Sequence, residues 1–382
     1  MESMTKMTAV ASQLSDEFAT RAAQYDKSGE FPTENYRAMR ELGYLAGPVP
    51  AELGGLDAGL AENARAQRIL ARGCASTALA INMHLFQVGA AAMGWRASAG
   101  AAGSVRANEP VLRRIVDEGI VLGSTGAEAI VAGEFEPKTI AEHDGDHLVI
   151  SGRRYFCSQA TGMDVVRVNA LDAESGEILV VAVPAKAAGV TVVPTWDTLG
   201  MRATASHDVV LDKVRVPKTA IGARLPVAGP AWAPAFASAI RWFLTGVAGV
   251  YLGIADRAAQ AAYESKSARN GALRDPALTD MMFGRLETTM LRAEAVFEYG
   301  IDSVAAISDP VAAMAKAIAV RQETTDAAVA AVDLAVDLAG GGAYYKTSIL
   351  ERLVRDVRAA RHHPPAAPVS YQMLGKYRRE AA

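Results

Sequence analysis

The sequence predicts a mainly α-helical fold with a β domain inserted near its middle. Amphipathic helical patterns cover most of residues 8–118, short β-branched runs separated by Gly, Asp and Pro cover 120–217, and alanine-rich helical patterns follow Pro226. Alternating runs bounded by turn residues are typical of strands, and long apolar patterns at helical spacing are typical of buried helices. We expect three domains: an N-terminal helical domain at 1–121, a middle β-barrel-like domain at 122–222 and a C-terminal four-helix bundle at 223–382.

The N-terminal domain is predicted as two groups of helices joined by a loop. Residues 8–45 suit amphipathic helices, with Gly43 as a helix-ending residue. The loop lies at 48–55, where two prolines and two glycines interrupt any regular pattern. Further helices are expected at 60–72, 76–93 and 109–118.

The middle domain is predicted from five short runs rich in β-branched residues, each bounded by turn residues. The runs lie at 147–150, 165–168, 178–183, 190–193 and 209–216. Strands at this spacing, with no helical pattern between them, favour an antiparallel sheet.

The C-terminal domain is predicted from four long alanine-rich patterns, because alanine has the highest helix propensity. The patterns lie at 233–266, 276–303, 309–339 and 347–361. The most apolar stretch, Phe243 to Ala255, is flanked by Arg241 and Asp256 and is too short to span a bilayer, so we expect a buried helix. The first 45 residues mix charged and apolar residues and have no signal-peptide pattern.

Composition excludes several classes of function. The net charge of −3 over 382 residues provides no basic field for a nucleic acid or an anionic membrane. Cys74 and Cys157 are the only cysteines, and they have neither a disulfide framework nor metal-ligand spacing. We therefore expect a cytoplasmic enzyme without a metal site, a membrane partner or a nucleic-acid partner.

Residues 150–159 form the first motif. They read as a strand that contains Phe156 and Ser158, and by themselves they predict no more than a strand with a buried aromatic ring.

The second motif lies at 196–210. Gly200 permits a turn there, and the side chains of Ser206 and Asp208 can satisfy loop amides. We interpret this segment as structural rather than catalytic.

The third motif is the glycine-rich segment 340–344. Gly340 and Gly341 have no Cβ, so their backbone could closely approach a cofactor. The plainer alternative is a cluster that ends a helix. Opposite charges four residues apart support the helix that follows: Glu351 with Arg355, and Arg352 with Asp356.

Together these segments resemble the acyl-CoA dehydrogenase superfamily, and the resemblance extends over nearly the whole chain. It implies helical, β and four-helix-bundle domains, assembly as a homotetramer or dimer, and bound FAD, with FMN as the less favoured alternative. Superfamily dehydrogenases usually have Trp and Thr where this chain has Phe156 and Ser158, which are commoner among relatives that use oxygen. The chain is thus identified as an atypical member, similar to the superfamily's flavin-dependent monooxygenases.

The resemblance also implies which residues meet the flavin. Phe156 would stack beside the isoalloxazine ring, Ser158 would bond to it, and the glycine pair would lie against the pyrophosphate or ribityl chain. Further cofactor contacts are expected from Thr125 and Gly126 at the pyrimidine ring, from Lys266 or Arg269 at a phosphate, and from Asp337, which replaces a family glutamine.

The chain departs from the superfamily at the catalytic base. Many members have a glutamate eight residues beyond the Arg-Asp pair, where this chain has Pro364, and others place the base where this chain has Ile240. Histidines are the remaining proton carriers, because their ordinary pKa of about 6.5 suits acid or base work. The catalytic candidates are His363, His362 and His84, with Glu128 as a relocated base; each histidine could equally be a surface or core residue.

Three functions remain open from the sequence. The first is an atypical flavin oxidoreductase that brings reduced flavin and dioxygen to a small or acyl-type substrate, a reaction that needs no carbon-acid base. The second is α,β-desaturation of an acyl-CoA or acyl-carrier-protein substrate with His363, His362 or Glu128 as base. The third is a non-catalytic flavoprotein subunit. The expected partner is a flavin reductase for the first function and an electron-transfer flavoprotein for the second.

Overall fold

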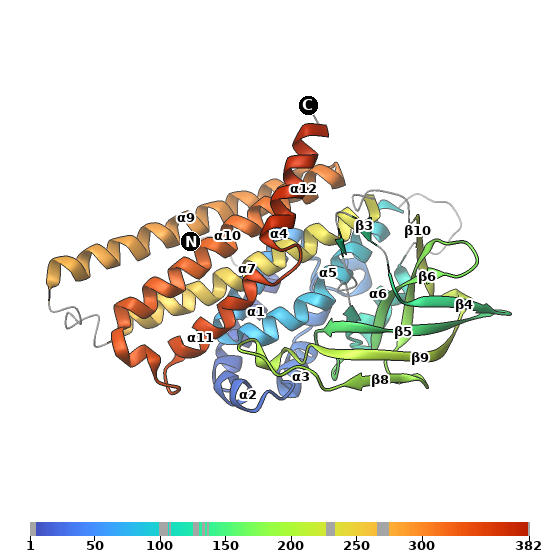
Figure 1. Cartoon of the computed structure of the whole chain (residues 1–382), viewed down its shortest axis with the longest axis horizontal. Helices are drawn as coiled ribbons and strands as arrows, with labels where there is room; N and C mark the ends of the chain where they lie inside the picture. Colours follow the sequence, from blue (N-terminus) through green and yellow to red (C-terminus); the bar gives the residue numbers. More distant parts are fainter. Residues whose placement is uncertain are drawn as a thin grey trace.

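The structure is a computed structural model that describes residues 5–98, 106, 108–124, 130–131, 134–135, 137–226, 234–265 and 275–380. A helical bundle and a β-sheet lie side by side (Figure 1). Helix α5 (Ala75–Ala97) contacts both, and α4 (Leu60–Gly73) packs against the bundle. The predicted fold class is confirmed. One buried cluster contains residues from all three regions, including Leu79 of the N-terminal helices, Val168 of the sheet and Tyr251 of the bundle.

The described residues of the N-terminal region up to 118 form helices, turns and loops, and the helix predicted at 109–118 is confirmed residue for residue. The proline- and glycine-containing loop forms short 3₁₀ turns. The elements around α4 and α5 are α1 (Lys6–Ala19), α2 (Ala22–Ser28), α3 (Thr33–Glu41), η1 (Tyr44–Ala46), η2 (Ala51–Leu53) and α6 (Glu109–Glu118).

The middle region forms one main sheet with the strand order β10-β7-β6-β4-β5-β9-β8, and β1 pairs with β6 at its side. The bounds are β1 (Leu122–Ser124), β4 (Ile140–Asp144), β5 (His147–Cys157), β6 (Val165–Asp172), β7 (Ile178–Pro184), β8 (Val190–Val193), η3 (Arg202–Thr204), β9 (His207–Pro217), η4 (Lys218–Ala220) and β10 (Ile221–Leu225). Two short strands, β2 (Ile130–Val131) and β3 (Glu134–Phe135), pair separately.

The expected purely antiparallel sheet is wrong in two places. Strand β6 runs parallel to β1, with Leu122 opposite Val165, and it also runs parallel to β4. Neither β1 nor β4 is joined to β6 by a hairpin. The alternation of side chains along a strand is the same in parallel and antiparallel pairs, so the sequence pattern could not predict the direction of these two pairings.

The C-terminal region is a bundle of long helices: α7 (Pro234–Glu264), α9 (Pro276–Ala306), α10 (Pro310–Ala339) and α11 (Ile349–Arg358), with η5 (Gly340–Tyr344) and η6 (Ala359–Arg361) as connections and α12 (Ala367–Glu380) at the end. Helices α9 and α10 begin with proline after an aspartate cap: the Asp275 carboxylate accepts from the Ala277 N–H at 2.9 Å, and Asp309 accepts from the Ala312 N–H at 2.8 Å. Helix α12, which projects from the bundle in Figure 1, was not predicted.

Two bundle helices, α7 and α10, are long and apolar enough to cross a membrane by length and composition. The run Phe243 to Ala255 lies in the middle of a 31-residue helix, longer than the apolar run itself, and the expected buried helix is confirmed. Of the apolar windows in α7 and α10, 78 % and 56 % of the residues are buried inside the protein. The apolar character of these helices is therefore accounted for by packing in the bundle.

Candidate active site

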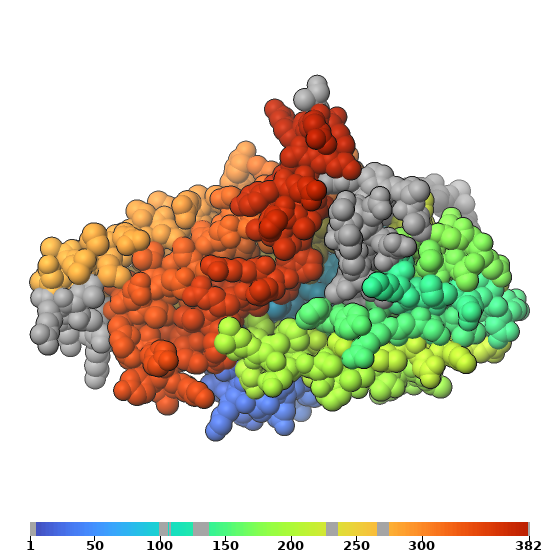
Figure 2. Space-filling model, in the orientation of Figure 1, coloured from blue at the N-terminus to red at the C-terminus, as the bar shows by residue number. Residues whose placement is uncertain are grey.

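A recess separates the C-terminal segments from the β strands, and part of α5 is visible at its floor in Figure 2. Phe156 and Ser158 lie at the end of β5. The Phe156 ring is 64 % exposed and meets Trp196 edge-on, with 6.1 Å between ring centroids. Its backbone has φ 54°, a left-handed conformation that bulky residues rarely adopt and that is often found at functional sites. This strained turn therefore leaves the face of the Phe156 ring open at the surface.

Gln159 fixes the turn that follows Phe156. Its backbone N–H donates to the Thr204 carbonyl at 2.7 Å, and its side-chain amide donates to the Leu122 carbonyl at 2.8 Å. The hydroxyl of Tyr36, from α3, donates to its Oε1 at 2.6 Å. Because Gln159 is fully buried and bonded to three separate segments, the turn is held firmly beside β1.

Ser158 begins a chain of hydroxyl groups. Its Oγ lies 2.9 Å from Oγ of Ser206, which lies 2.7 Å from Oγ1 of Thr204, and Thr204 donates to the Met201 carbonyl at 3.0 Å. A hydroxyl has one hydrogen to donate. The Thr204 hydrogen is used on Met201, so Ser206 donates to Thr204 and Ser158 donates to Ser206. The free lone pairs of Ser158 are then available to a hydrogen-bond donor on a ligand.

An aromatic wall lies next to this turn. The Phe86 ring of α5 meets the Phe243 ring of α7 edge-on, with 5.7 Å between centroids, and both side chains are partly exposed. The amide of Gln87, beside Phe86, donates to the carbonyls of Leu122 and Gly123, at 3.3 Å each. Because the Leu122 carbonyl also accepts from Gln159, it links the turn that carries Phe156 to the part of α5 that carries Phe86.

His363 lies at the same wall. Its ring centroid is 6.4 Å from that of Phe243, and its Nδ1 lies 2.8 Å from the hydroxyl of Tyr251. Burial raises the pKa of Tyr251, so its hydroxyl keeps its proton, and the Ala359 carbonyl lies 3.4 Å from the same Nδ1. These two groups occupy Nδ1 and leave Nε2 for a ligand. Burial lowers the pKa of His363 to about 4, with smaller contributions from the charges of Arg321 and His362. The imidazole is therefore neutral at pH 7.

The other two predicted histidines differ from His363. His362 is exposed, and its backbone N–H donates to the Ala359 carbonyl at 3.0 Å. His84 is fully buried: its Nδ1 accepts from the Leu122 N–H at 3.0 Å, and its Nε2 donates to the Leu45 carbonyl at 2.9 Å. With both ring nitrogens bonded to backbone, His84 has none left for a substrate, so the structure favours a structural role rather than the predicted catalytic one.

We expect His84 to make stability depend on pH. Burial lowers its folded-state pKa to about 4 from an ordinary value of about 6.5. The unfolded chain therefore binds more protons between these values, and the free energy of unfolding should fall as pH is lowered from about 6.5 to 4, by on the order of 1–3 kcal/mol from this residue. Urea unfolding across this range should show a smaller pH slope for His84→Gln than for the original chain. An unchanged slope would contradict the assignment.

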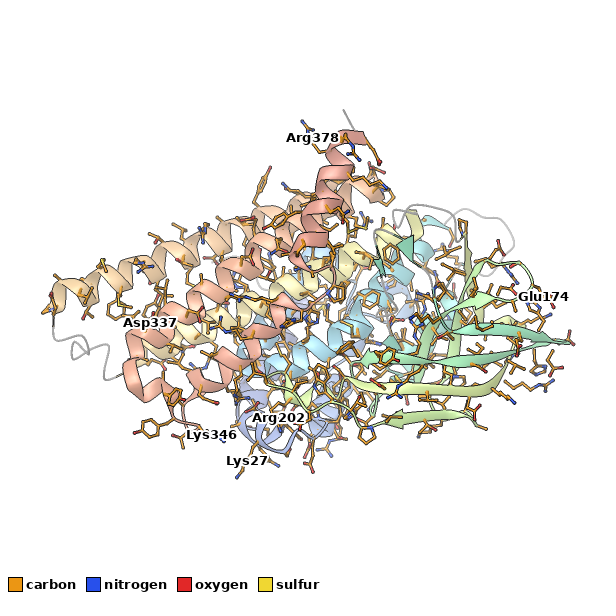
Figure 3. The ribbon with its side chains drawn as sticks, in the orientation of Figure 1. Lys27, Glu174, Arg202, Asp337, Lys346 and Arg378 are labelled. Carbon is orange, nitrogen blue, oxygen red and sulfur yellow. The ribbon has the colours of Figure 1, made fainter. Side chains whose placement is uncertain are left out.

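The second set of predicted cofactor residues lies elsewhere. Asp337 is exposed near the end of α10, at the opposite end of the bundle from the sheet, as the labels Asp337 and Lys346 show in Figure 3. Gly340 and Gly341 follow it in η5. A single chain therefore does not bring these residues to Phe156 and Ser158.

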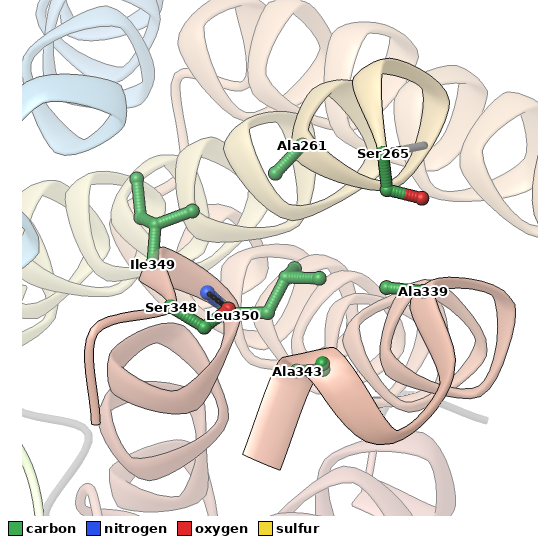
Figure 4. Close-up of a pocket in the computed structure, with 8 residues that line it drawn as sticks. Ala261, Ser265, Ala339, Ala343, Ser348, Ile349 and Leu350 are labelled. Carbon is green, nitrogen blue, oxygen red and sulfur yellow. Dashed lines mark hydrogen bonds between the residues drawn. The ribbon is translucent and has the colours of Figure 1, made fainter. Parts of the chain in front are cut away.

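The glycine turn instead borders a pocket of about 270 Å³ (Figure 4). The pocket is lined by residues from α7, α10, η5 and α11: Ala261, Ser265, Ala339, Gly342, Ala343, Ser348, Ile349 and Leu350. Lys266 and Arg269, which follow Ser265 in the chain, lie outside the described residues, as do Thr125, Gly126 and Glu128. The roles of all these residues stay predictions.

The segment 196–210 is anchored to α11. The Asp356 carboxylate accepts from the Met201 N–H at 2.6 Å, and a Cβ on Gly200 would lie 2.3 Å from the Arg355 carbonyl oxygen. Gly200 is needed for this close approach rather than for a turn. The predicted Glu351–Arg355 pair is confirmed at 2.7 Å, whereas Asp356 bonds to backbone instead of forming the predicted pair with Arg352.

The predicted loop-capping by Ser206 and Asp208 is corrected in the same segment. Ser206 bonds to the two hydroxyls of Ser158 and Thr204 rather than to loop amides. The carboxylate of Asp208 accepts from the Arg153 guanidinium at 2.7 Å and from the Thr195 hydroxyl at 3.0 Å. Both side chains join strands and turns of the sheet.

Comparison with known proteins identifies the family. Three protein-family models match the chain. They describe the acyl-CoA dehydrogenase N-terminal domain, over residues 4–95, the middle domain, over 126–214, and the C-terminal domain, over 245–367. The chain is 30 % identical over 366 residues to the putative acyl-CoA dehydrogenase YdbM of Bacillus subtilis, covering 92 % of this chain and 91 % of that protein. The chain belongs to the acyl-CoA dehydrogenase superfamily.

Other relatives are named as nitrososynthases or monooxygenases. L-evernosamine nitrososynthase of a Micromonospora species is 31 % identical over 359 residues, covering 89 % of this chain and 82 % of that protein. The solved structure of KijD3 with FMN and a dTDP-linked amino sugar has a TM-score of 0.84 and 25 % identity, covering 100 % of this chain and 95 % of the other. This superfamily member is thus a flavin-dependent oxidoreductase.

Two buried residues of the site, Tyr251 and Arg321, were missed from the sequence. Both lie inside alanine-rich helical patterns, where a polar residue gives no sign of the direction in which it points. Their only sequence signal is a single polar residue on an apolar helix face.

Proposed function

We propose that this protein is a monooxygenase that uses reduced FMN and dioxygen to oxidise a nitrogen or sulfur atom of a small molecule. When bound, reduced FMN supplies two electrons, so that one oxygen atom of dioxygen enters the substrate and the other leaves as water. The chain's own residues bind the ring, shield it from water and place a hydrogen-bonding group beside it.

This proposal rests on one observation. His363 is bonded to Tyr251, and the next residue, Pro364, stands where many superfamily members have their catalytic glutamate. Pro364 cannot accept a proton from carbon, and Ile240, at the other position where the superfamily places its base, is apolar. The neutral imidazole of His363 instead has Nδ1 bonded to Tyr251 and Nε2 left to donate or accept according to its tautomer. Such a group can bond to oxygen or to a substrate amine, whereas desaturation needs a base positioned for α-proton removal.

Ser158 supports the use of a reduced flavin. Its hydrogen is directed to Ser206, so its oxygen is left as an acceptor. A reduced flavin ring carries an N–H at a position where the oxidised ring has only a lone pair. We therefore assign Ser158 as an acceptor for that N–H and Phe156 as the aromatic surface beside the ring.

FMN replaces the FAD that the resemblance implied. Asp337 places an exposed carboxylate beside the glycine turn, where FAD would bring a diphosphate of the same charge sign. Among the relatives, the KijD3 structure contains FMN, and a protein of Pseudomonas putida, 26 % identical over 209 residues, is named a probable FMNH2-dependent monooxygenase. A separate flavin reductase is the partner that would supply reduced FMN.

The decisive experiment separates reduction of the flavin from its reaction with oxygen. The purified protein is loaded with FMN or FAD and first exposed without oxygen to a panel of acyl-CoA thioesters. We expect no bleaching of the flavin. After photoreduction of the FMN, addition of ¹⁸O₂ with a panel of amines and thioethers should give a product that contains one ¹⁸O atom, and reduced FMN should bind more tightly than reduced FAD.

The alternative, desaturation with a relocated base, is favoured by the similarity to the putative dehydrogenase YdbM. Stoichiometric bleaching of the flavin by an acyl-CoA before oxygen is admitted would establish that alternative and refute our proposal.

A further inference from the structure

Arg321 lies beneath the loop that carries His363. It is on α10, is 2 % exposed and is among the largest fully buried side chains. Its NH2 group donates to the carbonyl of Pro365 and, at 3.4 Å, to the carbonyl of His363. Its NH1 lies 3.4 Å from Oε1 of Gln322. The guanidinium therefore holds backbone on both sides of Pro364.

The charge of Arg321 is not neutralised by an ion pair. Within the described ranges no carboxylate lies within ion-pair distance of its guanidinium, and its Nε has no hydrogen-bond partner there. Burial lowers its pKa. A buried cation without a carboxylate destabilises a fold, and an apolar side chain of similar size is often as stable or better. Fold stability alone therefore does not account for this arginine.

We propose that Arg321 is a positioning residue, which clamps the loop 363–365 against α10 and so keeps the His363 imidazole against Tyr251 in the active site. This inference rests on the proposed function, because it assigns Arg321 to the reaction through His363. The NH2 group of Arg321 donates to the carbonyls of His363 and Pro365, which are two residues apart. Holding the loop at two points fixes both its position and the course of its backbone.

The charge of Arg321 has a second effect on His363. The groups that face the imidazole are Tyr251 from α7, Arg321 from α10 and the neighbouring His362, and the negative groups Asp356 and Asp326 act on Tyr251 and Arg321 respectively. Arg321 and His362 both oppose protonation of His363. Loss of the guanidinium should therefore raise the pKa of His363 toward its ordinary value of about 6.5.

Arg321 can be reached from outside the active site. A pocket of about 230 Å³ borders the same loop and is lined by Arg321, Gln322, Asp326, Ala360, Arg361, Ala366, Ala367 and Pro368. Replacing Arg321 with alanine should leave the space of its guanidinium empty, and a small cation such as guanidinium should be able to enter that space through this pocket. This access makes chemical rescue a direct test.

The test compares Arg321→Ala, Arg321→Lys and Arg321→Met with the control Arg361→Ala, which removes an exposed arginine that lines the same pocket. We expect Arg321→Ala and Arg321→Met to oxidise substrate about 10²-fold more slowly while folded and flavin-bound, because misplacement by about 1 Å can cost that much. Arg321→Lys should recover part of the rate, and Arg361→Ala should match the original chain. Low-millimolar guanidinium should accelerate Arg321→Ala but not the original chain.

A second readout needs no turnover. With ¹³C-labelled histidine, the six imidazoles can be titrated by NMR, and His363 is assigned from its absence in His363→Ala. The pKa of His363 should rise in Arg321→Met and stay unchanged in Arg361→Ala. An unshifted His363 together with an undiminished rate in folded Arg321→Met would overturn the inference. If the original chain oxidises no substrate, the proposed function fails, and the titration still decides whether Arg321 controls His363.

Discussion

Replacing His363 with alanine is expected to lower the rate of substrate oxidation by about 10²–10⁴-fold, the usual contribution of a positioned proton-transfer group. Flavin binding should persist, because Phe156 and Ser158 are held by Gln159 and Ser206 and not by His363. The measurement is a single turnover of the enzyme loaded with reduced FMN and mixed with oxygenated substrate. Product yield should fall, and reduced flavin should instead be oxidised by oxygen without transfer to substrate.

Two further variants sharpen this prediction. His362→Ala removes the exposed neighbouring imidazole and should stay close to the original rate. Tyr251→Phe removes the hydroxyl 2.8 Å from Nδ1, which holds the ring in place, so its rate should lie between those of the two histidine variants. Equal losses in His362→Ala and His363→Ala would show that the loop matters but that His363 has no individual role.

The pH dependence follows from the same residue. Because burial lowers the pKa of His363 to about 4, the ring stays neutral as pH falls through the range in which an ordinary histidine protonates. The rate should therefore show no loss attributable to His363 until pH approaches 4, whereas an Arg321 variant should lose activity at a higher pH. A loss centred near the ordinary histidine value in the original chain would contradict the assigned environment.

The sequence predicted the elements whose signals are local. The helix at 109–118 and the strand at 190–193 match the structure, and the bundle helices agree within a few residues, because hydrophobic periodicity depends on near neighbours. Strands β1, β2, β3, β4 and β10 and helix α12 were missed. They are short or partly exposed, and their stability comes from pairing or packing with distant segments.

The candidate site was predictable only in part. Phe156 and Ser158 were found through the resemblance to a family, whereas the hydroxyl chain from Ser158 to Met201 joins segments about 45 residues apart and has no local pattern. His84 shows the converse. A histidine on a helix near the site suggests catalysis, but the two backbone groups that occupy its nitrogens lie 38 and 39 residues away. The role of each of these side chains depends on contacts with distant residues, and these contacts cannot be predicted from residue spacing along the chain.

Replacing Gly253 with alanine is expected to destabilise the protein by about 3 kcal/mol or more, near the upper end of the range for overpacked cores. Helices α4 and α7 cross so closely that a Cβ on Gly253 would lie 2.2 Å from the Arg68 carbonyl oxygen, and one on Gly249 would lie 2.3 Å from the Ala64 carbonyl oxygen. Backbone cannot rotate away as a side chain can, so the helices must separate. Separation would also disturb the ion pair between Arg68 and Asp256, at 2.8 Å.

Gly253→Ala should destabilise the protein because of the close contact with the Arg68 carbonyl, although helix propensity alone predicts the opposite. Alanine is favoured over glycine in a helix by about 1 kcal/mol, so without the contact the substitution would stabilise the protein. Gly284 provides the matched control: it lies inside α9, a helix of the same length as α7, and a Cβ there would meet nothing within 4 Å. In urea unfolding, Gly284→Ala should be at least as stable as the original chain, and Gly253→Ala should unfold at a much lower urea concentration. If the two variants shift in the same direction, the close packing of α4 on α7 does not limit stability.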